Sequence, residues 1–498
     1  MKPSILLLTI SGALMCQLSR AQDITWADDV ACVIYNNCVK CHNPSGVAPF
    51  SLLTYEQAFE KRILIGAYVE ARLMPPWPAS GGTQDFVNDN RLTEEEVATI
   101  TGWVDAGAPS GDLSQAPSVP VIPEGDEIEN PDLVVQMETY TSQAGDHDDY
   151  RCFVIPTNFA EDRYVNSFEV VPGNKNIVHH VILFEDVSQT VQDLDALDPL
   201  PGYTCFGGTG SFQSSVVAGW VPGQTSRTMP EGTGILLPAG TNLVIQTHYP
   251  EGTEGMLDST RVNLTFTEDP GSTREMLYVP LLNHTDISLV NGPLSIPAGE
   301  VKTYRAEFTT FFKSTVFSVL PHMHLIGTSM KAYGVTLTGD TLHFFDIPDW
   351  DFEWQLSYTY RQPVVVPFGT KLVAEATYDN TNNNPNNPSN PPVDVMQGEA
   401  TTDEMLLVFF EFALYQDGDE DMVFADAPPL SEECQGTSTS RGIPADLPIT
   451  VFPNPAADRI HIQGEVEGAF SVTLRDLSGR VLVSAENRTR LDVSGIPR

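Results

Sequence analysis

The chain has 498 residues, 41% of them hydrophobic and 18% charged, a composition that excludes disorder as the default state. This length is too great for one core and predicts about three domains. The formal net charge of −40 excludes electrostatic binding to nucleic acid or to an anionic membrane, and we interpret it as an aid to solubility in a salty exterior.

The first 21 residues are typical of a secretory signal peptide. Lys2 provides the positive start, residues 5–14 form a short apolar run, and small residues at positions 19 and 21 make a cleavage site. The run is too short to span a membrane, and the sequence has no other run of 18 apolar residues. We therefore expect a protein that passes through the periplasm to the exterior or the cell surface, without a transmembrane segment.

Residues 22–112 contain the haem-attachment pattern C-x-x-C-H, which is Cys38-Val39-Lys40-Cys41-His42. Two thioether bonds at this spacing tie the porphyrin to one turn of chain, and the adjacent His42 reaches the iron. Met74 is the only Met of this stretch and is therefore the expected second ligand, in a Met/His pair that suits electron transfer. A disulfide, a redox-active dithiol or half a zinc site are the alternatives, and the exported compartment disfavours them.

The helical pattern of this stretch predicts a capped amphipathic helix from Thr93 to Gly107. Together with the haem motif, residues 22–112 resemble the small class I cytochromes c, and the resemblance implies a small α-helical domain that carries one haem c. The Pro- and acid-rich residues 113–128 are expected to form a linker.

From residue 129 to 428 the pattern changes to short apolar and β-branched runs separated by turn residues. Examples are the runs at 178–184, 242–249 and 405–410. This pattern is typical of antiparallel sandwiches or barrels, and the stretch is long enough for two such domains.

Histidines in this β region have the spacing of metal ligands. His322 and His324 form an H-x-H pair, which on a strand faces one side. His179 and His180 are neighbours, so they can share one ion only at a bulge or at a strand end. His248 closes an apolar run.

Met405 opens a further apolar run in the β region. Imidazole together with thioether suits copper, and thioether especially suits Cu(I).

The order H-H, H, H-x-H and Met resembles the type II copper monooxygenases, the peptidylglycine-hydroxylating and dopamine β-hydroxylating enzymes. The resemblance extends to three motifs: Gln246-x-His248, Pro321-His322-x-His324-Leu325-x-Gly327 and Asp403-Glu404-Met405. It implies two antiparallel β jelly rolls, over residues 129–290 and 291–428, that face each other across a solvent-filled cleft. It also implies two copper ions: an electron-supplying one on His179, His180 and His248, and an oxygen-activating one on the catalytic residues His322, His324 and Met405.

The sequence departs from the peptide-amidating members at two positions. Leu320 stands where those enzymes have the Arg that reads the substrate carboxylate, and Phe409 stands where they have a Tyr. These changes disfavour peptide amidation.

Four cysteines remain outside the signal and the haem motif. They allow three pairings that the sequence cannot separate, and we prefer a bridge between Cys152 and Cys205, the other two cysteines being Cys32 and Cys434.

Residues 447–498 alternate in the manner of β-strands, starting at Val451-Phe452-Pro453-Asn454-Pro455. They resemble the C-terminal sorting domain of type IX secretion in Bacteroidota, which implies that the secretion machinery is a partner. A generic small β domain is the alternative. Because that family normally ends with one more strand, we expect a truncated, β-sandwich-like domain here.

These features predict a multidomain enzyme that hydroxylates a C–H bond of a small organic substrate with O2. The electrons are expected to pass from the fused haem to the copper on His179, His180 and His248, or to come from another one-electron donor such as ascorbate or a redox protein. A non-catalytic surface protein that transfers electrons or binds copper is the alternative, and Met405 favours the enzyme because a simple copper store needs no thioether site. A peroxidase is disfavoured because a Met ligand blocks the haem iron.

Overall fold

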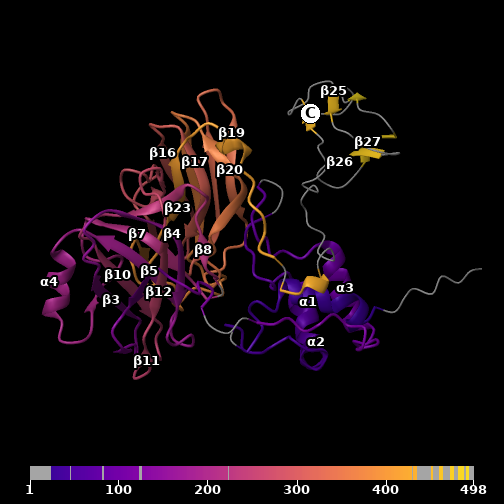
Figure 1. Cartoon of the computed structure of the whole chain (residues 1–498), viewed down its shortest axis with the longest axis horizontal. Helices are drawn as coiled ribbons and strands as arrows, with labels where there is room; N and C mark the ends of the chain where they lie inside the picture. The colour runs from indigo at the N-terminus through magenta and orange to yellow at the C-terminus, as the bar shows by residue number, and fades with distance from the viewer. Residues whose placement is uncertain are drawn as a thin grey trace, which may run out of the picture. The chain divides into compact units, whose positions relative to one another are not determined.

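A computed structural model describes residues 24–434 except 45, 81–83, 123–125, 223 and 429, and five strands between residues 450 and 492. The chain divides into two compact units, Met1–Cys434 and Gln435–Arg498 (Figure 1). The expected signal peptide lies outside the described residues. Across the described part of the chain, every helix is too short or too polar to cross a membrane.

The N-terminal segment is helical and has its own core. Its helices are η1 (Trp26–Val30), α1 (Ala31–Asn37), α2 (Tyr55–Glu70) and α3 (Glu94–Asp105). Thr93 caps α3 in a reciprocal capping box with Glu96, which confirms the helix expected from Thr93. Trp26 and Trp103 are almost fully buried and pack against each other at the centre of this core.

The first β region has two main sheets. One holds β1 (Leu133–Gln136), β12 (Arg261–Phe266), β4 (Arg163–Val171), β9 (Thr233–Leu237) and β13 (Arg274–Glu275), with β8 (Arg227–Thr228) beside β4. The other holds β6 (Tyr203–Thr204), β3 (Asp149–Pro156), β10 (Asn242–Tyr249), β5 (His180–Asp186) and β7 (Ser214–Trp220). Three smaller elements complete the region: β2 (Tyr140–Thr141), β11 (Leu257–Asp258) and α4 (Thr190–Leu197).

The central strand β10 is buried at every residue because it lies between β3 and β5 and both faces of the sheet are covered. It delivers His248 to the edge of this core.

The second β region is built from two four-stranded sheets. The first is β14 (Leu277–Asn283), β23 (Leu407–Leu414), β17 (Ser314–His322) and β20 (Tyr358–Val366). The second is β16 (Val301–Thr309), β21 (Lys371–Asp379), β18 (Gly327–Val335) and β19 (Thr341–Ile347). The pair β15 (Ser295–Ile296) and β22 (Val395–Met396) and the short helices η2 (Asp419–Asp421) and η3 (Glu432–Cys434) complete unit 1.

Strand β14 pairs with β23, so the change from the first to the second pair of sheets falls near Met276, inside the stretch expected to form the first β domain. The described strands pair antiparallel, with β9 and β13 as the parallel exception. The fold is therefore mostly antiparallel β with a small helical part, and the jelly-roll connectivity stays a prediction.

Part of the expected haem domain belongs to the core of the second β region. Ala79 and Phe86 are each 1% exposed and pack within that core. Phe86 also forms a β-bridge with Tyr360 on β20. A disulfide between Cys32 and Cys434 fastens the other side of the helical segment to the end of the unit.

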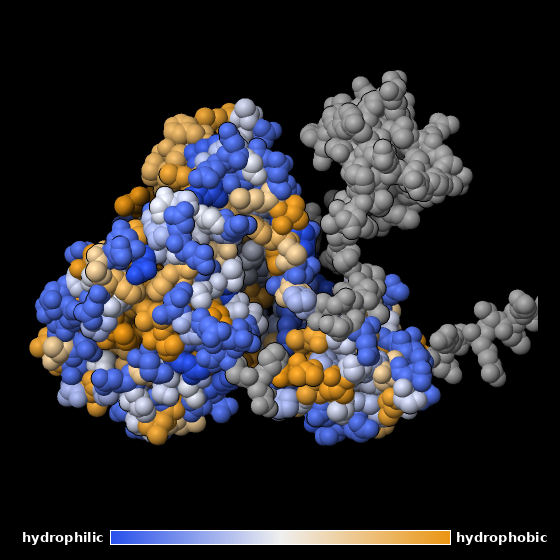
Figure 2. All heavy atoms as spheres, viewed as in Figure 1, coloured by the Kyte–Doolittle hydropathy of each residue, from blue (hydrophilic) through white to orange (hydrophobic). Residues whose placement is uncertain are grey.

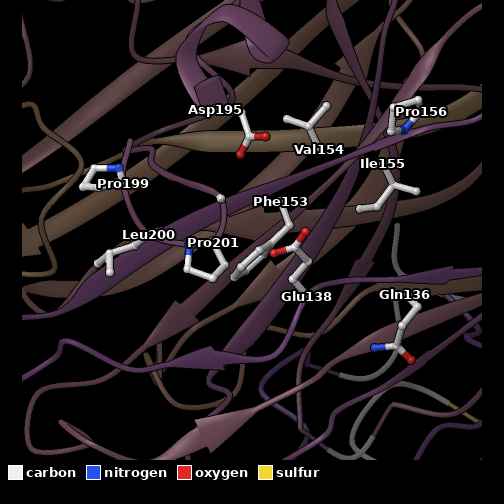
Figure 3. A pocket seen from close by; sticks show the side chains of 11 residues that line it. Gln136, Glu138, Phe153, Val154, Ile155, Pro156, Asp195, Pro199, Leu200 and Pro201 are labelled. Carbon is white, nitrogen blue, oxygen red and sulfur yellow. The ribbon is translucent and has the colours of Figure 1, made fainter. Parts of the chain in front are cut away.

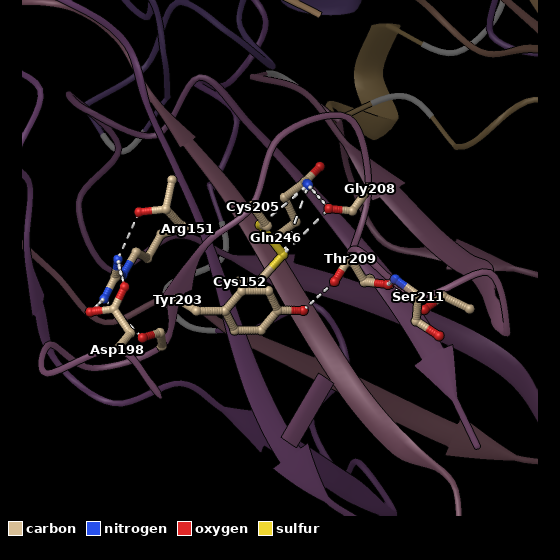
Figure 4. Close-up of a disulfide and its surroundings, with 12 residues drawn as sticks. Arg151, Cys152, Asp198, Tyr203, Cys205, Gly208, Thr209, Ser211 and Gln246 are labelled. Atoms are coloured by element: carbon tan, nitrogen blue, oxygen red, sulfur yellow. Dashed lines mark hydrogen bonds and ion pairs between the residues drawn. A yellow bond between two sulfur atoms is a disulfide. The ribbon is translucent and has the colours of Figure 1, made fainter. Parts of the chain in front are cut away.

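The second disulfide joins Cys152 on β3 to Cys205, which confirms the preferred pairing (Figure 4). The side-chain amide of Gln246 on β10 lies beside it, 3.5 Å from Cys205 Sγ, and donates to the carbonyl of Gly208 at 3.1 Å. The bridge therefore anchors the loop after β6 to β3, and the Gln246 amide ties the same loop to β10, the strand that carries His248.

We expect the double change Cys152→Ser and Cys205→Ser to lower the free energy of unfolding of the first β region by about 4 kcal/mol, because it frees a long loop in the unfolded chain. Thermal denaturation of the oxidised protein measures this. Treating the parent with a reductant should lower the midpoint at least as far, because it opens the Cys32–Cys434 bridge as well. An unchanged midpoint in both experiments would contradict the structural role of the bridge.

The second unit contains two small sheets. Their strands are β24 (Thr450–Phe452), β25 (Arg459–Gln463) and β28 (Arg490–Asp492) in one, and β26 (Ser471–Arg475) and β27 (Val481–Glu486) in the other.

On the first unit, the face drawn in Figure 2 is largely hydrophilic with hydrophobic residues between, in keeping with the large negative charge of the chain.

Candidate metal centres

The structure brings His179, His180 and His248 together in one cluster, which we call the three-His cluster. One ring nitrogen from each lies within 4.8 Å of the others, and Nδ1 of His179 is 3.3 Å from Nδ1 of His180. The neighbours can share a site because His180 is the first residue of β5 and His179 precedes the strand. His179 is held by its N–H, which donates to the carbonyl of His248 at 2.9 Å.

The buried imidazole of His248 is the strongest sign that this cluster fits a metal ion. The residue is 2% exposed, its Nδ1 makes no hydrogen bond to any described residue, and its Nε2 faces the Asp148 carboxylate, 3.3 Å away. Buried polar atoms without partners are rare in folded proteins, and a metal ion supplies such a partner.

The electrostatics of the cluster point the same way. Burial lowers the pKa of His179 to about 4 and that of His180 well below the usual range, so both rings are neutral, the form that binds metal.

Two residues of the β3 strand and the loop before it surround His248. The ring of Tyr150 stacks on the His248 ring with centroids 4.2 Å apart and planes at 6°. The Asp148 carboxylate lies 3.3 Å from His248 Nε2, and the Thr401 hydroxyl approaches the same carboxylate oxygen at 3.5 Å. Asp148 thereby connects the three-His cluster to the loop that precedes Met405.

His322 and His324 form the second cluster, with ring centroids 5.0 Å apart. His322 ends β17, and Met323 between them is fully buried in the core, so it points away from the cluster as expected. The Nδ1 atom of His322 pairs with Gln355 Oε1, and Nδ1 of His324 donates to the carbonyl of Asp403 at 3.2 Å.

Both rings of the second cluster therefore keep Nε2 available for a metal ion, the arrangement that outer-shell acceptors impose on ligating histidines. Burial lowers the pKa of His322 to about 3 and that of His324 to about 4, so these imidazoles are also neutral.

Glu404 ties Met405 to the H-x-H turn. Its buried carboxylate accepts the N–H groups of His324 at 2.9 Å, Ile326 at 2.8 Å and Met405 at 3.2 Å. Met405 is 7% exposed, and Tyr378 donates to its carbonyl at 2.7 Å. One carboxylate thus holds the segment of Met405 against the turn that carries His324.

Removing this carboxylate should loosen the second cluster. We expect Glu404→Ala to lower the free energy of unfolding by about 3 kcal/mol, because three buried N–H groups lose their acceptor. Glu404→Gln should lower it less, since the amide oxygen still accepts. Calorimetric melting of the two variants measures the difference, and equal midpoints for Glu404→Ala and the parent would contradict the role of Glu404.

The ring of Phe352 contacts one histidine of each cluster. The Phe352 ring is 6.0 Å from that of His179 and nearly parallel to it, and 6.1 Å from that of His324 and edge-on. One side chain therefore packs against both clusters.

The residues of the haem motif form one turn after α1. The N–H groups of Cys41 and His42 both donate to the carbonyl of Cys38, at 3.1 and 2.9 Å. Nδ1 of His42 pairs with the carbonyl of Phe50 at 3.0 Å, which leaves Nε2 for an axial bond.

The two thiols of this motif are not bonded to each other, and burial raises the pKa of Cys38 to about 12, which argues against a redox-active dithiol. Together with the free Nε2 of His42, this arrangement fits a covalently attached haem. Met74 lies half-buried beyond the end of α2, where its N–H donates to the carbonyl of Tyr68 at 3.3 Å, and its role as a ligand stays a prediction.

Sequence reasoning missed four residues that support the clusters: Asp148, Phe352, Gln355 and His284. His284, 9% exposed, accepts the N–H of Leu406 through Nδ1 at 3.1 Å. Asp148 was a member of an acidic run, and the other three had no neighbouring ligand in the sequence, so only the fold could place them.

A cavity of about 440 Å³ lies apart from the two clusters (Figure 3). It is lined by residues of β3 and of the chain around α4, including Glu138, Phe153 and Asp195. It contains none of the predicted ligands.

Comparison with known proteins gives two findings, one for the C-terminal tail and one for a stretch of 290 residues. Residues 450–498 match the family described as the secretion system C-terminal sorting domain, which confirms the predicted tail and supports a secreted or cell-surface location. Over 290 residues the chain is 24% identical to DBH-like monooxygenase protein 2 of Mus musculus, covering 52% of this chain. The chain spans 42% of the length of that relative, and the likeness supports a monooxygenase family for the matched part.

The similarity to solved structures is much weaker, in both sequence identity and TM-score. A structure of PNGF-II has a TM-score of 0.22 and 10% identity, covering 60% of this chain and 65% of that one. The infectious bursal disease virus VP2 subviral particle has a TM-score of 0.14 and 10% identity, covering 61% and 86%. Scores this low carry no conclusion about fold or function.

Proposed function

We propose that this protein is a copper-dependent monooxygenase that hydroxylates a C–H bond of a small organic molecule with O2. The observation that carries the proposal is the paired arrangement itself: an all-imidazole cluster and a second cluster with an adjacent Met, with one aromatic ring packed against both. The relative named a monooxygenase supports the same class.

Copper bound at these clusters would supply one-electron redox chemistry and a place for O2 to react. The chain's own residues prepare both sites. Gln355 and the carbonyl of Asp403 orient the imidazoles of the second cluster, and Glu404 fixes the position of Met405. The ring of Phe352 packs against His179 of one cluster and His324 of the other.

The substrate is proposed to bind through an apolar part. Leu320 and Phe409, the two departures from the peptide-amidating pattern, are register partners on β17 and β23. Tyr278 on β14 stacks on Phe409 with centroids 5.2 Å apart. These half-buried side chains form an apolar surface on the strands that lead to the second cluster, and they offer a peptide carboxylate no cation.

Arg227 reaches this sheet from the first β region, and its charge is already neutralised. Arg227 of β8 forms an ion pair with Glu411, and Ser318 donates to the same carboxylate at 2.6 Å. The proposed substrate is therefore uncharged on the side that contacts Leu320.

Because only one oxygen atom enters the product, each turnover needs two electrons. We propose that a haem bound to Cys38, Cys41 and His42 supplies these electrons. An external one-electron donor, such as ascorbate or a redox protein, would then reduce the haem again.

Reductant-dependent O2 consumption with candidate substrates tests the function. We expect His322→Ala to lower turnover by at least about 100-fold. His343→Ala is the matched control, because this exposed imidazole on β19 is outside both clusters. Turnover that is absent with every donor and substrate would instead favour a non-catalytic electron-transfer or copper-binding protein.

A further inference from the structure

The segment that follows the predicted haem ligand Met74 is fastened to the second β region. We call the described residues 77–80 and 84–91 the strap. Its backbone N–H at Ser80 donates to the carbonyl of Asp346 at 2.7 Å, and that at Val87 donates to the carbonyl of Thr359 at 2.8 Å. These bonds continue the edges of β19 and β20.

Charged groups reinforce the same attachment. The guanidinium of Arg361 on β20 binds the Asp85 carboxylate of the strap at 3.2 Å and the Asp426 carboxylate at 2.8 Å. The N–H of Asn88 donates to Asp426 as well, at 2.7 Å. The strap is thus held by backbone bonds on one side and by a shared ion-pair network on the other.

Aromatic rings also join the strap to the strands beneath it. The Trp77 ring meets the Tyr358 ring edge-on, with centroids 5.3 Å apart and planes at 87°. Phe86 lies 5.2 Å from the same Tyr358 ring. Phe86 and Tyr358 are at most 1% exposed, so this contact is buried in the core rather than formed at a mobile surface.

Tyr358 is close in the chain to the second cluster. It follows Gln355 by three residues, and Gln355 Oε1 pairs with Nδ1 of His322. On the other side, Trp77 follows Met74 by three residues. One ring contact and two short stretches of covalent chain therefore connect the predicted haem ligand to His322.

We propose that the Trp77–Tyr358 contact is where electrons pass from the haem segment into the β regions, so that the second cluster receives them first. Electron tunnelling weakens steeply with distance and is best carried by covalent bonds and close contacts, which this connection provides. From the sequence, electrons were expected to pass from the haem to the three-His cluster. In the route proposed here they arrive at that cluster second, through the ring of Phe352.

The step transfers one electron and changes no other bond. A haem held by Cys38, Cys41 and His42 would give up one electron, from Fe(II) to Fe(III), and a copper ion held by His322 and His324 would take it up, from Cu(II) to Cu(I). The external one-electron donor then reduces the haem again. This inference rests on the two cofactors of the proposed function, but not on any substrate being oxidised.

Anaerobic stopped-flow mixing tests the route without turnover. The full-length protein, with both clusters loaded with Cu(II), is mixed with a one-electron reductant that reduces the haem. Haem absorbance and the Cu(II) electron paramagnetic resonance signal are then followed. We expect rapid haem reoxidation to persist in His248→Ala and to be lost in His322→Ala.

The aromatic contact has its own pair of variants. Trp77→Leu should slow haem reoxidation at least about tenfold, whereas Trp77→Phe, which keeps a ring and the packing, should retain most of the rate. The haem spectrum and the melting midpoint of each variant establish that the fold is intact. The histidine variants leave the strap untouched and keep the test valid even if Trp77→Leu does not fold.

Loss of rapid reoxidation in His248→Ala with retention in His322→Ala would overturn the proposed route, as would a rate that is unchanged by Trp77→Leu in a folded protein. If electrons pass from the haem to the second cluster as expected but no substrate is oxidised, the monooxygenase proposal is wrong and the proposed electron route is still supported.

Discussion

Replacing His248 with alanine is expected to lower the copper content of the chain from about two ions to about one. The cluster has three imidazoles, and loss of one removes a third of its ligands while leaving the neighbouring neutral rings too few to hold the ion tightly. Elemental analysis after equilibration with limiting copper and removal of free ions measures the content.

The matched variants show which ion has been lost. His322→Ala should also leave about one ion, but with a different Cu(II) resonance signal, and the double variant should hold almost none. His343→Ala should behave as the parent. If His248→Ala retains both ions with the parental signal, the assignment of the three-His cluster as a copper site is wrong.

Changing both Cys38 and Cys41 to serine is expected to abolish covalent haem. The thioether bonds have no other thiol in that turn to form on, because Cys32 is committed to the disulfide with Cys434. Haem staining of a denaturing gel, on which only covalently attached haem survives, measures the loss.

His42→Ala separates attachment from ligation at the same turn. This variant should keep the stained band but change the haem spectrum, since the two cysteines remain and the axial imidazole is gone. A parent protein that shows no stained band when expressed with haem-attachment machinery would refute the haem assignment altogether.

Local patterns were enough for much of the fold. The capping residues Thr93 and Glu96 are three positions apart in the chain, so their mutual bonds and the helix they start are visible in the sequence. The alternation of short apolar runs likewise predicts an antiparallel β region, and the tail is recognised by its own motif. The cysteines are different: their number allows three pairings, and only the approach of β3 to the loop after β6 selects Cys152 with Cys205.

The residues that support the clusters could not be predicted from local patterns, because their partners are far away in the chain. Gln355 reaches His322 across 33 positions, and Glu404 reaches His324 across 80. Neither residue carries a sequence signal that points to its partner, because such contacts depend on which strands lie side by side. The strap around Phe86 is a stronger case: its position in the chain assigns it to the haem segment, and its burial assigns it to the second β core.

The sequence by itself determined that the chain has a helical part, a mostly antiparallel β part and a sorting tail, and it predicted which residues ligate metal or bind haem. Only the tertiary structure decided how close the two histidine clusters lie, which groups orient their rings, and where the haem segment is attached. The physical reason is that ligand type and strand periodicity are local properties of the chain. Distances between clusters arise from sheet pairing and core packing between residues that are far apart in the chain.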